Sequence, residues 1–333
     1  MKKLFIVLML ACAMGLPFIG CDPVGPEPTP TPTPAPTPTP APTVSEYDLL
    51  TEAGDAYFGT YSGVNINADD FFAAVAGGDT LAIYDWRSAD DYAAAHVTGA
   101  VNAALTDLDE LLPTLDADTP IVNICYTGQS ASFVTAVMNL YGLSAQNLKF
   151  GMCGLAADAA IVPGSTKWVD AIADDEFADL LETTANTATM TYEPPDPGTG
   201  ETTLQEIIVA GLDAAAAGWN IAAADVFLDT AGYFIVNYWP EDQYLDPGHI
   251  PGAYQFTPKV DLDSGAKLNL LPTDGTVVVY CYSGQTSAQV SAYLRLLGYD
   301  AKSLLYGMNG FGYEVIPASK YTAPTTDYTS IIE

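Results

Sequence analysis

Two cysteines, Cys125 and Cys281, each follow a short apolar segment and precede a segment with helical spacing. Each begins a glycine-containing loop, Cys-Tyr-Thr-Gly-Gln-Ser in one case and Cys-Tyr-Ser-Gly-Gln-Thr in the other. The glycine lets the loop curl, so that backbone amides and the N-terminus of the following helix surround the sulfur with partial positive charge. This field favours the thiolate, which is the nucleophilic form of cysteine. We therefore expect nucleophilic sulfur chemistry at both positions.

The residues after each cysteine form the predicted substrate-binding loops. Their curled amides would also hold a terminal persulfide, and the tyrosine beside each cysteine would partly exclude water. The alternative is a buried structural cysteine, but the recurrence of the same glycine loop favours a reactive site. The predicted loop residues are Tyr126, Thr127, Gly128, Gln129, Ser130, Tyr282, Ser283, Gly284, Gln285, Thr286 and Ser287.

The two loops belong to an internal repeat. The cysteines are 156 residues apart, and three glycines recur at the same offset. Upstream, Ala-His-Val-Thr-Gly-Ala at 95–100 is echoed by Gly-His-Ile-Pro-Gly-Ala at 248–253, and these segments contain the only two histidines of the sequence. Such self-similarity predicts two homologous domains.

Each repeat alternates segments typical of strands and helices. This alternation predicts an α/β fold, in which each domain has a mainly parallel sheet flanked by helices. The cysteines then lie at the carboxyl ends of strands, where open α/β sheets bind ligands. The predicted strands are 81–85, 121–124 and 148–150 in the first repeat and 234–237, 276–280 and 304–306 in the second; the predicted helices are 89–95, 129–141, 241–245 and 285–297.

The motifs around the cysteines resemble those of tandem rhodanese-like proteins, of the sulfurtransferase family. The first repeat reads Asp85-Trp-Arg87, Asp91-Tyr92, His96-Val-Thr-Gly-Ala and then the Cys125 loop. The second reads Asn237-Tyr-Trp239, Gln243-Tyr244, Gly-His249-Ile-Pro-Gly-Ala and then the Cys281 loop. The resemblance covers roughly residues 65–160 and 215–315 and implies two rhodanese-like domains.

The resemblance implies that a cysteine thiolate takes sulfane sulfur from thiosulfate, polysulfide or a similar donor and passes it to a thiol or cyanide. It implies no cofactor. Related phosphatases and arsenate reductases use a longer loop with an arginine six places after the cysteine, where Ala131 and Ser287 stand here. Without that arginine there is no bidentate clamp for phosphate, so phosphatase chemistry is disfavoured.

The sequence also departs from the family pattern. Neither cysteine loop contains lysine or arginine, which many members use to hold anionic donors. The second repeat has Asn237, Trp239 and Gln243 in place of the charged frame residues. Two other functions therefore stay open: a non-catalytic rhodanese-like binding module of an envelope complex, and thiolate-based handling of another chalcogen such as selenium. Both cysteines remain candidate catalytic residues, with a slight preference for Cys281 because tandem members often use the second domain.

Five further residues have predicted roles. Asp85, Arg87, His96 and His249 are expected to brace the scaffold, as the resemblance implies. Cys153, in Gly151-Met-Cys-Gly154, follows the last predicted strand of the first repeat. Because parallel strands end on one side of the sheet, Cys153 is a candidate resolving thiol for Cys125. No metal site is expected, since the histidines lie in separate repeats and the cysteine spacing is wrong for zinc.

The chain is strongly acidic, and it begins like a secreted lipoprotein. Its 333 residues include 10 Lys+Arg and 41 Asp+Glu, for a net charge of −31, which excludes nonspecific binding to nucleic-acid phosphates. A basic start precedes an apolar run over 4–19, and Gly20-Cys21 resembles the cleavage site of bacterial lipoproteins. We expect cleavage before Cys21, a lipid on Cys21, and an extracytoplasmic protein anchored to a bacterial membrane, facing the periplasm or the cell surface, with an envelope protein as a further candidate partner.

The expected domain plan follows from composition. Residues 1–20 form the signal peptide, and 21–44 form the lipidated end and a Pro/Thr-rich stalk of polyproline II type. The first rhodanese-like domain covers 45–182, a polar linker covers 183–203, the second domain covers 204–318, and 319–333 form a loose C-terminal tail.

Overall fold

The computed structural model describes residue 25 and residues 44–60, 64–172 and 177–333. The predicted signal peptide, Cys21 and all but two residues of the predicted stalk lie outside the described residues. Residues from Val44 to Glu333 form one compact unit, which contains both repeats. Within the described residues, no helix is both long enough and apolar enough to cross a membrane.

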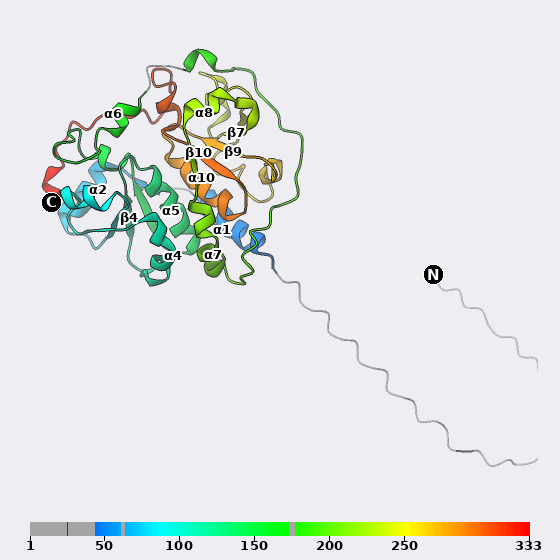
Figure 1. The fold of residues 1–333 in the computed structure, drawn as a ribbon, viewed down its shortest axis with the longest axis horizontal. Helices are drawn as coiled ribbons and strands as arrows, with labels where there is room; N and C mark the ends of the chain where they lie inside the picture. Colours follow the sequence, from blue (N-terminus) through cyan, green and yellow to red (C-terminus); the bar gives the residue numbers. More distant parts are fainter. Residues whose placement is uncertain (1–24, 26–43, 61–63, 173–176) are drawn as a thin grey trace, which may run out of the picture. The chain divides into compact units, whose positions relative to one another are not determined.

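Two five-stranded parallel sheets define two domains, which we call domain 1 and domain 2 (Figure 1). Their strand orders are β1-β5-β4-β2-β3 and β6-β10-β9-β7-β8, so the two domains have the same topology. The prediction of two α/β domains with parallel sheets is confirmed. The strands are β1 (Asn65–Ile66), β2 (Ala82–Asp85), β3 (Ala100–Asn102), β4 (Ile121–Ile124), β5 (Ala145–Leu148), β6 (Asn220–Ile221), β7 (Phe234–Asn237), β8 (Tyr254–Gln255), β9 (Val277–Tyr280) and β10 (Ala301–Leu304).

The central strands explain why the sheets are covered on both faces. Every residue of β4 and of β9 is buried, and a strand buried on both sides requires helices on both faces of its sheet. The helices are α1 (Glu46–Thr60), α2 (Ala68–Gly77), α3 (Ala89–Ala94), α4 (Leu108–Leu111), α5 (Gln129–Tyr141), α6 (Lys167–Ala171), α7 (Leu204–Ala216), α8 (Ala223–Leu228), α9 (Glu241–Leu245) and α10 (Gln285–Leu296).

The two domains share one hydrophobic core. Helices α5 and α10, which each follow a cysteine loop, pack closely against one another, and α1 and α7 pack on both of them (Figure 1). Phe133 of α5 lies against Trp219 of domain 2, with ring centroids 5.3 Å apart. Phe58 of α1 lies 5.2 Å from the ring of Tyr293 of α10. Because these buried rings belong to one cluster, the interface has the character of a protein interior.

The last strand of each sheet lies earlier than its apolar residues predict. The sequence favours strands at 148–150 and 304–306, but β5 ends at Leu148 and β10 ends at Leu304. The backbone turns at Phe150 (φ 65°) and Tyr306 (φ 62°), and a short 3-10 helix follows each of these residues. A residue in the left-handed conformation cannot continue a strand, so β5 and β10 cannot extend through Phe150 and Tyr306.

The composition of the C-terminal tail predicts a loose segment, but the tail is bound to domain 1. Val97 pairs with Ile332 in an antiparallel bridge, and the backbones of His96 and Glu333 exchange two hydrogen bonds of 2.8 Å. The hydroxyl of Tyr328 donates to Asp69 at 2.6 Å. The buried side chains of Tyr328 and Ile331 belong to the hydrophobic core of domain 1. The tail sequence has no clear periodicity, so this packing could not be predicted from it.

Candidate functional site

The two cysteine loops have the geometry that their sequences predict. Cys125 follows β4 and Cys281 follows β9, and a glycine stands at the N-cap of the next helix in both loops. Gly128 has φ 81° and Gly284 has φ 72°. A Cβ atom at Gly128 would lie 2.6 Å from Oε1 of Gln285, so glycine is required both by backbone conformation and by the close approach of the other domain.

Backbone amides donate hydrogen bonds to both sulfur atoms. The Cys125 Sγ accepts hydrogen bonds from the amides of Gly128, at 3.1 Å, and Ala131, at 3.4 Å. The Cys281 Sγ accepts one from the amide of Ser287 at 3.3 Å and lies 3.6 Å from the hydroxyl of the same serine. These contacts place each sulfur at the positive end of a helix, where a thiolate or persulfide anion is stabilised.

Burial opposes this effect at Cys125. Both cysteines are 2 % exposed, and burial raises the pKa of the Cys125 thiol above its ordinary value although four loop amides act to lower it. The sequence predicts a thiol shifted toward thiolate at this position, and for Cys125 that prediction is wrong. The physical reason is that the free-energy cost of removing the thiolate from water exceeds the stabilisation that the amide hydrogen bonds give it.

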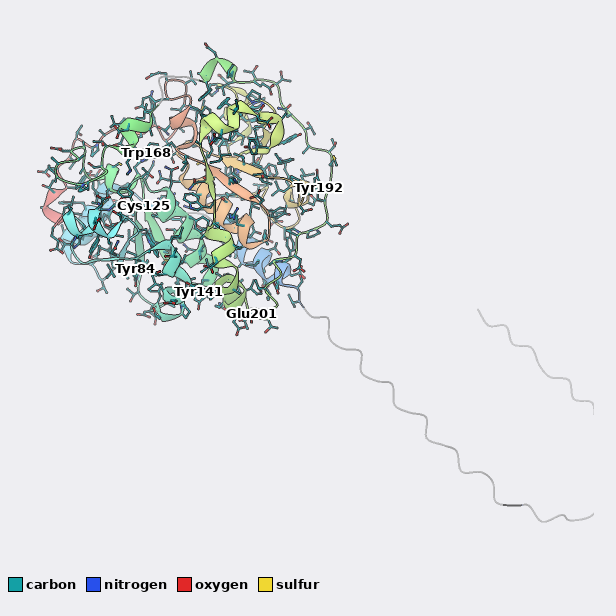
Figure 2. All side chains as sticks on the ribbon, in the orientation of Figure 1. Tyr84, Cys125, Tyr141, Trp168, Tyr192 and Glu201 are labelled. Atoms are coloured by element: carbon teal, nitrogen blue, oxygen red, sulfur yellow. The ribbon has the colours of Figure 1, made fainter. Side chains whose placement is uncertain are left out.

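Side chains of domain 1 cover the Cys125 loop. Tyr126 is held by hydrogen bonds to Ser88 and Asp91, and the ammonium of Lys167 lies 4.7 Å from the centre of its ring. The indole nitrogen of Trp168 donates to the carbonyl of Thr127 at 3.0 Å, so that Trp168 packs on the same loop (Figure 2). The segment around α6 therefore encloses this cysteine.

A cavity of about 300 Å³ adjoins Cys281. Its lining combines the cysteine loop of domain 2 with residues of domain 1 and one residue of the C-terminal tail. Sequence reasoning identified the loop residues but missed the others, because nothing local to them signals proximity to Cys281. The lining residues are Cys281, Tyr282, Ser283, Gln285, Thr286, Asn65, Asn67, Lys149 and Ser319.

The two glutamines of the loops connect the domains. Gln129 Oε1 accepts a hydrogen bond from the amide of Tyr306 at 2.7 Å, and Gln285 Oε1 accepts one from the amide of Phe150 at 3.0 Å. The amide nitrogen of each glutamine donates at 3.1 Å to a hydroxyl of its own loop, Thr127 or Ser283. These side chains, expected to bind substrate, are engaged in protein contacts. Ser130 and Thr286 occupy the second position of α5 and α10.

The predicted bracing residues lie behind the cysteine loops. Asp85 and Arg87 form a fully buried ion pair of 2.7 Å, and Arg87 also donates to the carbonyl of Ala95 at 2.6 Å. In domain 2 the ionic pair is replaced by neutral groups: Asn237 donates at 2.8 Å to the hydroxyl of Tyr280. The same strand end is thus held by charge in domain 1 and by a tyrosine in domain 2.

His96 and His249 have equivalent positions. The Nδ1 atom of each lies 2.9 Å from the carbonyl oxygen of a preceding tyrosine, Tyr92 or Tyr244. Each imidazole also stacks on the ring of that tyrosine, with centroids 4.0 Å and 3.7 Å apart. Both histidines therefore fix the turn that leads into the next strand.

Cys153 lies beside the Cys125 loop but is fully buried. Its backbone amide donates to the carbonyl of Tyr126 at 3.1 Å, and its thiol faces the carbonyl of Gly164 at 3.5 Å. It packs with Trp168 and Tyr321 in a small apolar cluster. Burial raises its pKa to about 11, so the thiol is protonated at neutral pH and would be slow as a resolving nucleophile.

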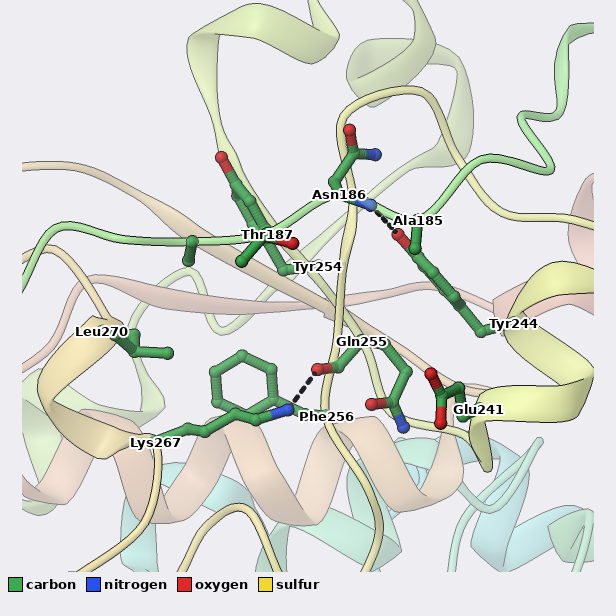
Figure 3. A pocket seen from close by; sticks show the side chains of 11 residues that line it. Ala185, Asn186, Thr187, Glu241, Tyr244, Tyr254, Gln255, Phe256, Lys267 and Leu270 are labelled. Carbon is green, nitrogen blue, oxygen red and sulfur yellow. Dashed lines mark hydrogen bonds between the residues drawn. The ribbon is translucent and has the colours of Figure 1, made fainter.

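A second cavity, of about 210 Å³, lies in domain 2 where residues 185–188 of the linker cross it (Figure 3). The amide of Asn186 donates to the hydroxyl of Tyr244 at 3.0 Å, which fixes the linker there. Lys267 donates to the carbonyl of Gln255 at 2.9 Å and forms a 2.7 Å ion pair with Asp261. This cavity contains no cysteine, and its one lysine is already neutralised.

The family model of the rhodanese-like domain matches residues 67–158 and 221–314, more than half of the chain. The chain belongs to the rhodanese-like domain family. It is a tandem member, since the two matches coincide with the two sheets. No curated protein matches it.

Solved structures are similar to about a quarter of the chain or to most of it. A rhodanese-like domain protein from Staphylococcus aureus is 18% identical, with 26% of this chain and 86% of that chain covered and a TM-score of 0.25. A protein from Staphylococcus saprophyticus is 19% identical, with coverage of 26% and 88% and a TM-score of 0.26. A thiosulfate sulfurtransferase from Pseudomonas aeruginosa is 14% identical, with coverage of 83% and 49% and a TM-score of 0.28.

Proposed function

We propose that this tandem rhodanese-like protein is a sulfurtransferase that carries sulfane sulfur as a persulfide on Cys281. The observation that carries the proposal is the polar cavity at Cys281, which gives a small donor access to a sulfur that accepts a hydrogen bond from the amide of Ser287 near a helix N-terminus. Membership of a sulfurtransferase-type family supports the chemistry.

The reaction is a double displacement at sulfur. The Cys281 thiolate attacks the outer sulfur of thiosulfate; a Cys–S–S⁻ persulfide forms, the sulfur–sulfur bond of the donor breaks, and sulfite leaves with the electron pair. In the second step cyanide or a thiolate attacks the outer sulfur of the persulfide. Thiocyanate or a new persulfide is released, and the Cys281 thiolate is restored. The Ser287 amide, which donates to the Cys281 sulfur, would stabilise the anion on sulfur in both states.

The two domains have different roles in this proposal. Domain 2 transfers sulfur, because Cys281 lines a cavity. Domain 1 keeps the loop but encloses Cys125 beneath Tyr126 and Trp168, and burial raises the pKa of its thiol. In this proposal domain 1 is a rhodanese-like module that supports the other site, and Cys125 does not carry sulfur.

We also propose that the protein is a lipoprotein of a bacterial envelope. The support comes from the sequence: an apolar run after Met-Lys-Lys, Gly20-Cys21 at its end, and a Pro/Thr-rich segment before the folded unit. A lipid on Cys21 would anchor the protein, and the proline-rich segment would hold the domains away from the membrane. Metabolic labelling with a fatty-acid analogue tests this; a Cys21→Ala variant should lose the label.

The test of sulfur transfer uses the full chain and its Cys125→Ser and Cys281→Ser variants. Each is incubated with thiosulfate or polysulfide, and the intact mass is measured for one added sulfur atom; cyanide is then added and thiocyanate is measured. We expect the added sulfur in the wild type and in Cys125→Ser but not in Cys281→Ser. An adduct that survives in Cys281→Ser and disappears in Cys125→Ser would reverse the roles of the domains. If no donor modifies either cysteine, the proposal of catalysis is wrong.

A further inference from the structure

Lys149 brings a positive charge from domain 1 to the cavity of domain 2. It follows β5 directly and lines the cavity beside Cys281. Two residues close to it in the chain are bound to the cysteine loop: the side chain of Asn147 donates to Gln285 Oε1 at 2.9 Å, and the amide of Phe150 donates to the same atom at 3.0 Å. The backbone that carries Lys149 is therefore fixed to the Cys281 loop through one glutamine.

The ammonium of Lys149 has no carboxylate partner among the described residues. It lies 5.2 Å from the centre of the Phe150 ring, and its partial burial lowers its pKa below the ordinary value for lysine. Four other basic side chains among the described residues do form ion pairs: Arg87 with Asp85, Lys267 with Asp261, Arg295 with Asp300 and Lys320 with Glu314. A partly desolvated, unpaired ammonium costs free energy, and an anion would offset that cost.

The rest of the cavity favours an anion as well. Its lining includes no aspartate or glutamate, although acidic residues outnumber basic ones by 41 to 10 in the whole chain. Asn65 Oδ1 accepts a hydrogen bond from Asn147 at 3.0 Å, which leaves its Nδ2 donor without a bond among the described residues. Ser283 and Thr286 add hydroxyl groups. The cavity thus has one cation, several neutral donors and a nucleophilic sulfur.

We propose that Lys149 is a specificity-determining residue that binds the anionic group of the sulfur donor at Cys281. The donor class is a small oxyanion that carries a sulfane sulfur, such as thiosulfate, whose sulfonate oxygens would contact Lys149 while its outer sulfur meets Cys281. The inference rests on the proposed sulfurtransferase function. It explains how a cysteine loop without lysine or arginine binds an anion: the cation is supplied across the domain interface.

The first test measures the charge preference of the cavity without requiring turnover. Iodoacetate and iodoacetamide alkylate the same thiol and have similar size, but only iodoacetate is an anion. The rate at which each modifies Cys281 is followed by peptide mass spectrometry in the full-length wild type and in Lys149→Gln, Lys149→Arg and Lys302→Gln. Lys302 belongs to β10 and does not line this cavity, so its variant controls for the change in net charge.

We expect Lys149→Gln to lower the ratio of the iodoacetate rate to the iodoacetamide rate by about 5- to 10-fold, because an attraction in a partly desolvated site is lost. Lys149→Arg keeps the charge and should keep the ratio, and Lys302→Gln should behave like the wild type. An unchanged ratio in Lys149→Gln, or an equal fall in Lys302→Gln, overturns the proposal. So does failure of both reagents to reach Cys281, because the cavity then admits no small anion.

A second measurement separates this inference from the proposed function. The KM for thiosulfate should rise by about 10-fold in Lys149→Gln with a smaller change in kcat, because the lost contact binds donor before and during the reaction. Sulfur transfer with an unchanged KM would overturn the role of Lys149 and leave the proposed function intact. If iodoacetate is preferred in a Lys149-dependent way but no donor transfers sulfur, Lys149 binds anions at this cavity and the proposed sulfurtransferase function is wrong.

Discussion

Gln129 and Gln285 form a reciprocal connection between the two cysteine loops. Each begins the helix after its cysteine, and each accepts a hydrogen bond from a backbone amide of the opposite domain, Tyr306 at 2.7 Å and Phe150 at 3.0 Å. The two cysteine loops are therefore connected by a matching pair of hydrogen bonds, and a change in either loop alters a contact with the other domain.

Substitution of Gln285 by alanine tests the strength of this connection. The partly buried amide of Phe150 would lose its acceptor, and Asn147 would lose one of its two acceptors. An unsatisfied buried donor costs about 1–3 kcal/mol. We expect the free energy of unfolding in urea to fall by that amount. Gln205→Ala is the control, since Gln205 is exposed on α7 and, among the described residues, its side chain bonds only to the carbonyl of Tyr141. Equal stability of the wild type and Gln285→Ala would contradict a structural role for the glutamine.

Much of the fold could be predicted because its signals are local. The apolar runs of β4 and β9, the glycines that end the helices and the repeated Cys-Tyr-(Thr/Ser)-Gly-Gln motif each depend on neighbouring residues only. Local patterns of this kind identify element type and order. The cysteine loops were predicted on the same basis, since a strand, a glycine turn and a helix are consecutive in the chain.

The remaining parts of the site depend on contacts between distant segments. Lys149 reaches the Cys281 cavity through the packing of two domains, and the loop at Cys125 is covered by Trp168, which follows it by 43 residues. The tail residue Ile332 pairs with Val97 across more than two hundred residues. No periodicity or spacing in one sequence encodes such proximity. The pKa of Cys125 could not be predicted either, because it depends on how completely these segments exclude water.

Cys153 should make the protein less stable at alkaline pH. Its pKa is raised from 9.0 to about 11 because the folded protein buries the thiol. Below pH 9 the thiol is protonated in both states and its stabilising contribution is complete. As the pH rises from 9 through 11, the unfolded chain releases this proton while the folded chain retains it, so the contribution is lost. The loss is on the order of 2 kcal/mol.

The measurement compares urea unfolding of the wild type and Cys153→Ser at pH 8 and pH 10.5. Serine keeps a group that can donate to the carbonyl of Gly164 but does not ionise in this range. Because the tyrosines titrate in both proteins, only the difference between them reports on Cys153. We expect stability to fall more steeply with pH in the wild type. Parallel pH profiles would mean that the thiol is less buried in solution than in this structure.

The ion pair of Asp85 and Arg87 should matter more for stability than its counterpart in domain 2. Asp85→Asn would leave the Arg87 guanidinium fully buried without a counter-charge, and stranding one partner of a buried pair costs about 3–5 kcal/mol. Asn237→Ala removes a neutral hydrogen bond to Tyr280, worth about 1 kcal/mol, and leaves no buried charge without its partner. Urea unfolding monitored by far-UV circular dichroism measures both changes.

A double variant separates the stranded charge from the loss of local packing. Asp85→Asn with Arg87→Met removes both charges, which gives domain 1 the uncharged strand end that domain 2 has at Asn237 and Trp239. Replacing a buried ion pair by apolar groups of similar volume is often nearly neutral, so we expect the double variant to be more stable than Asp85→Asn alone. If the double variant is the less stable of the two, Arg87 stabilises domain 1 mainly through its hydrogen bond to the carbonyl of Ala95. The uncharged strand end of domain 2 would then depend on the hydrogen bond between Asn237 and Tyr280.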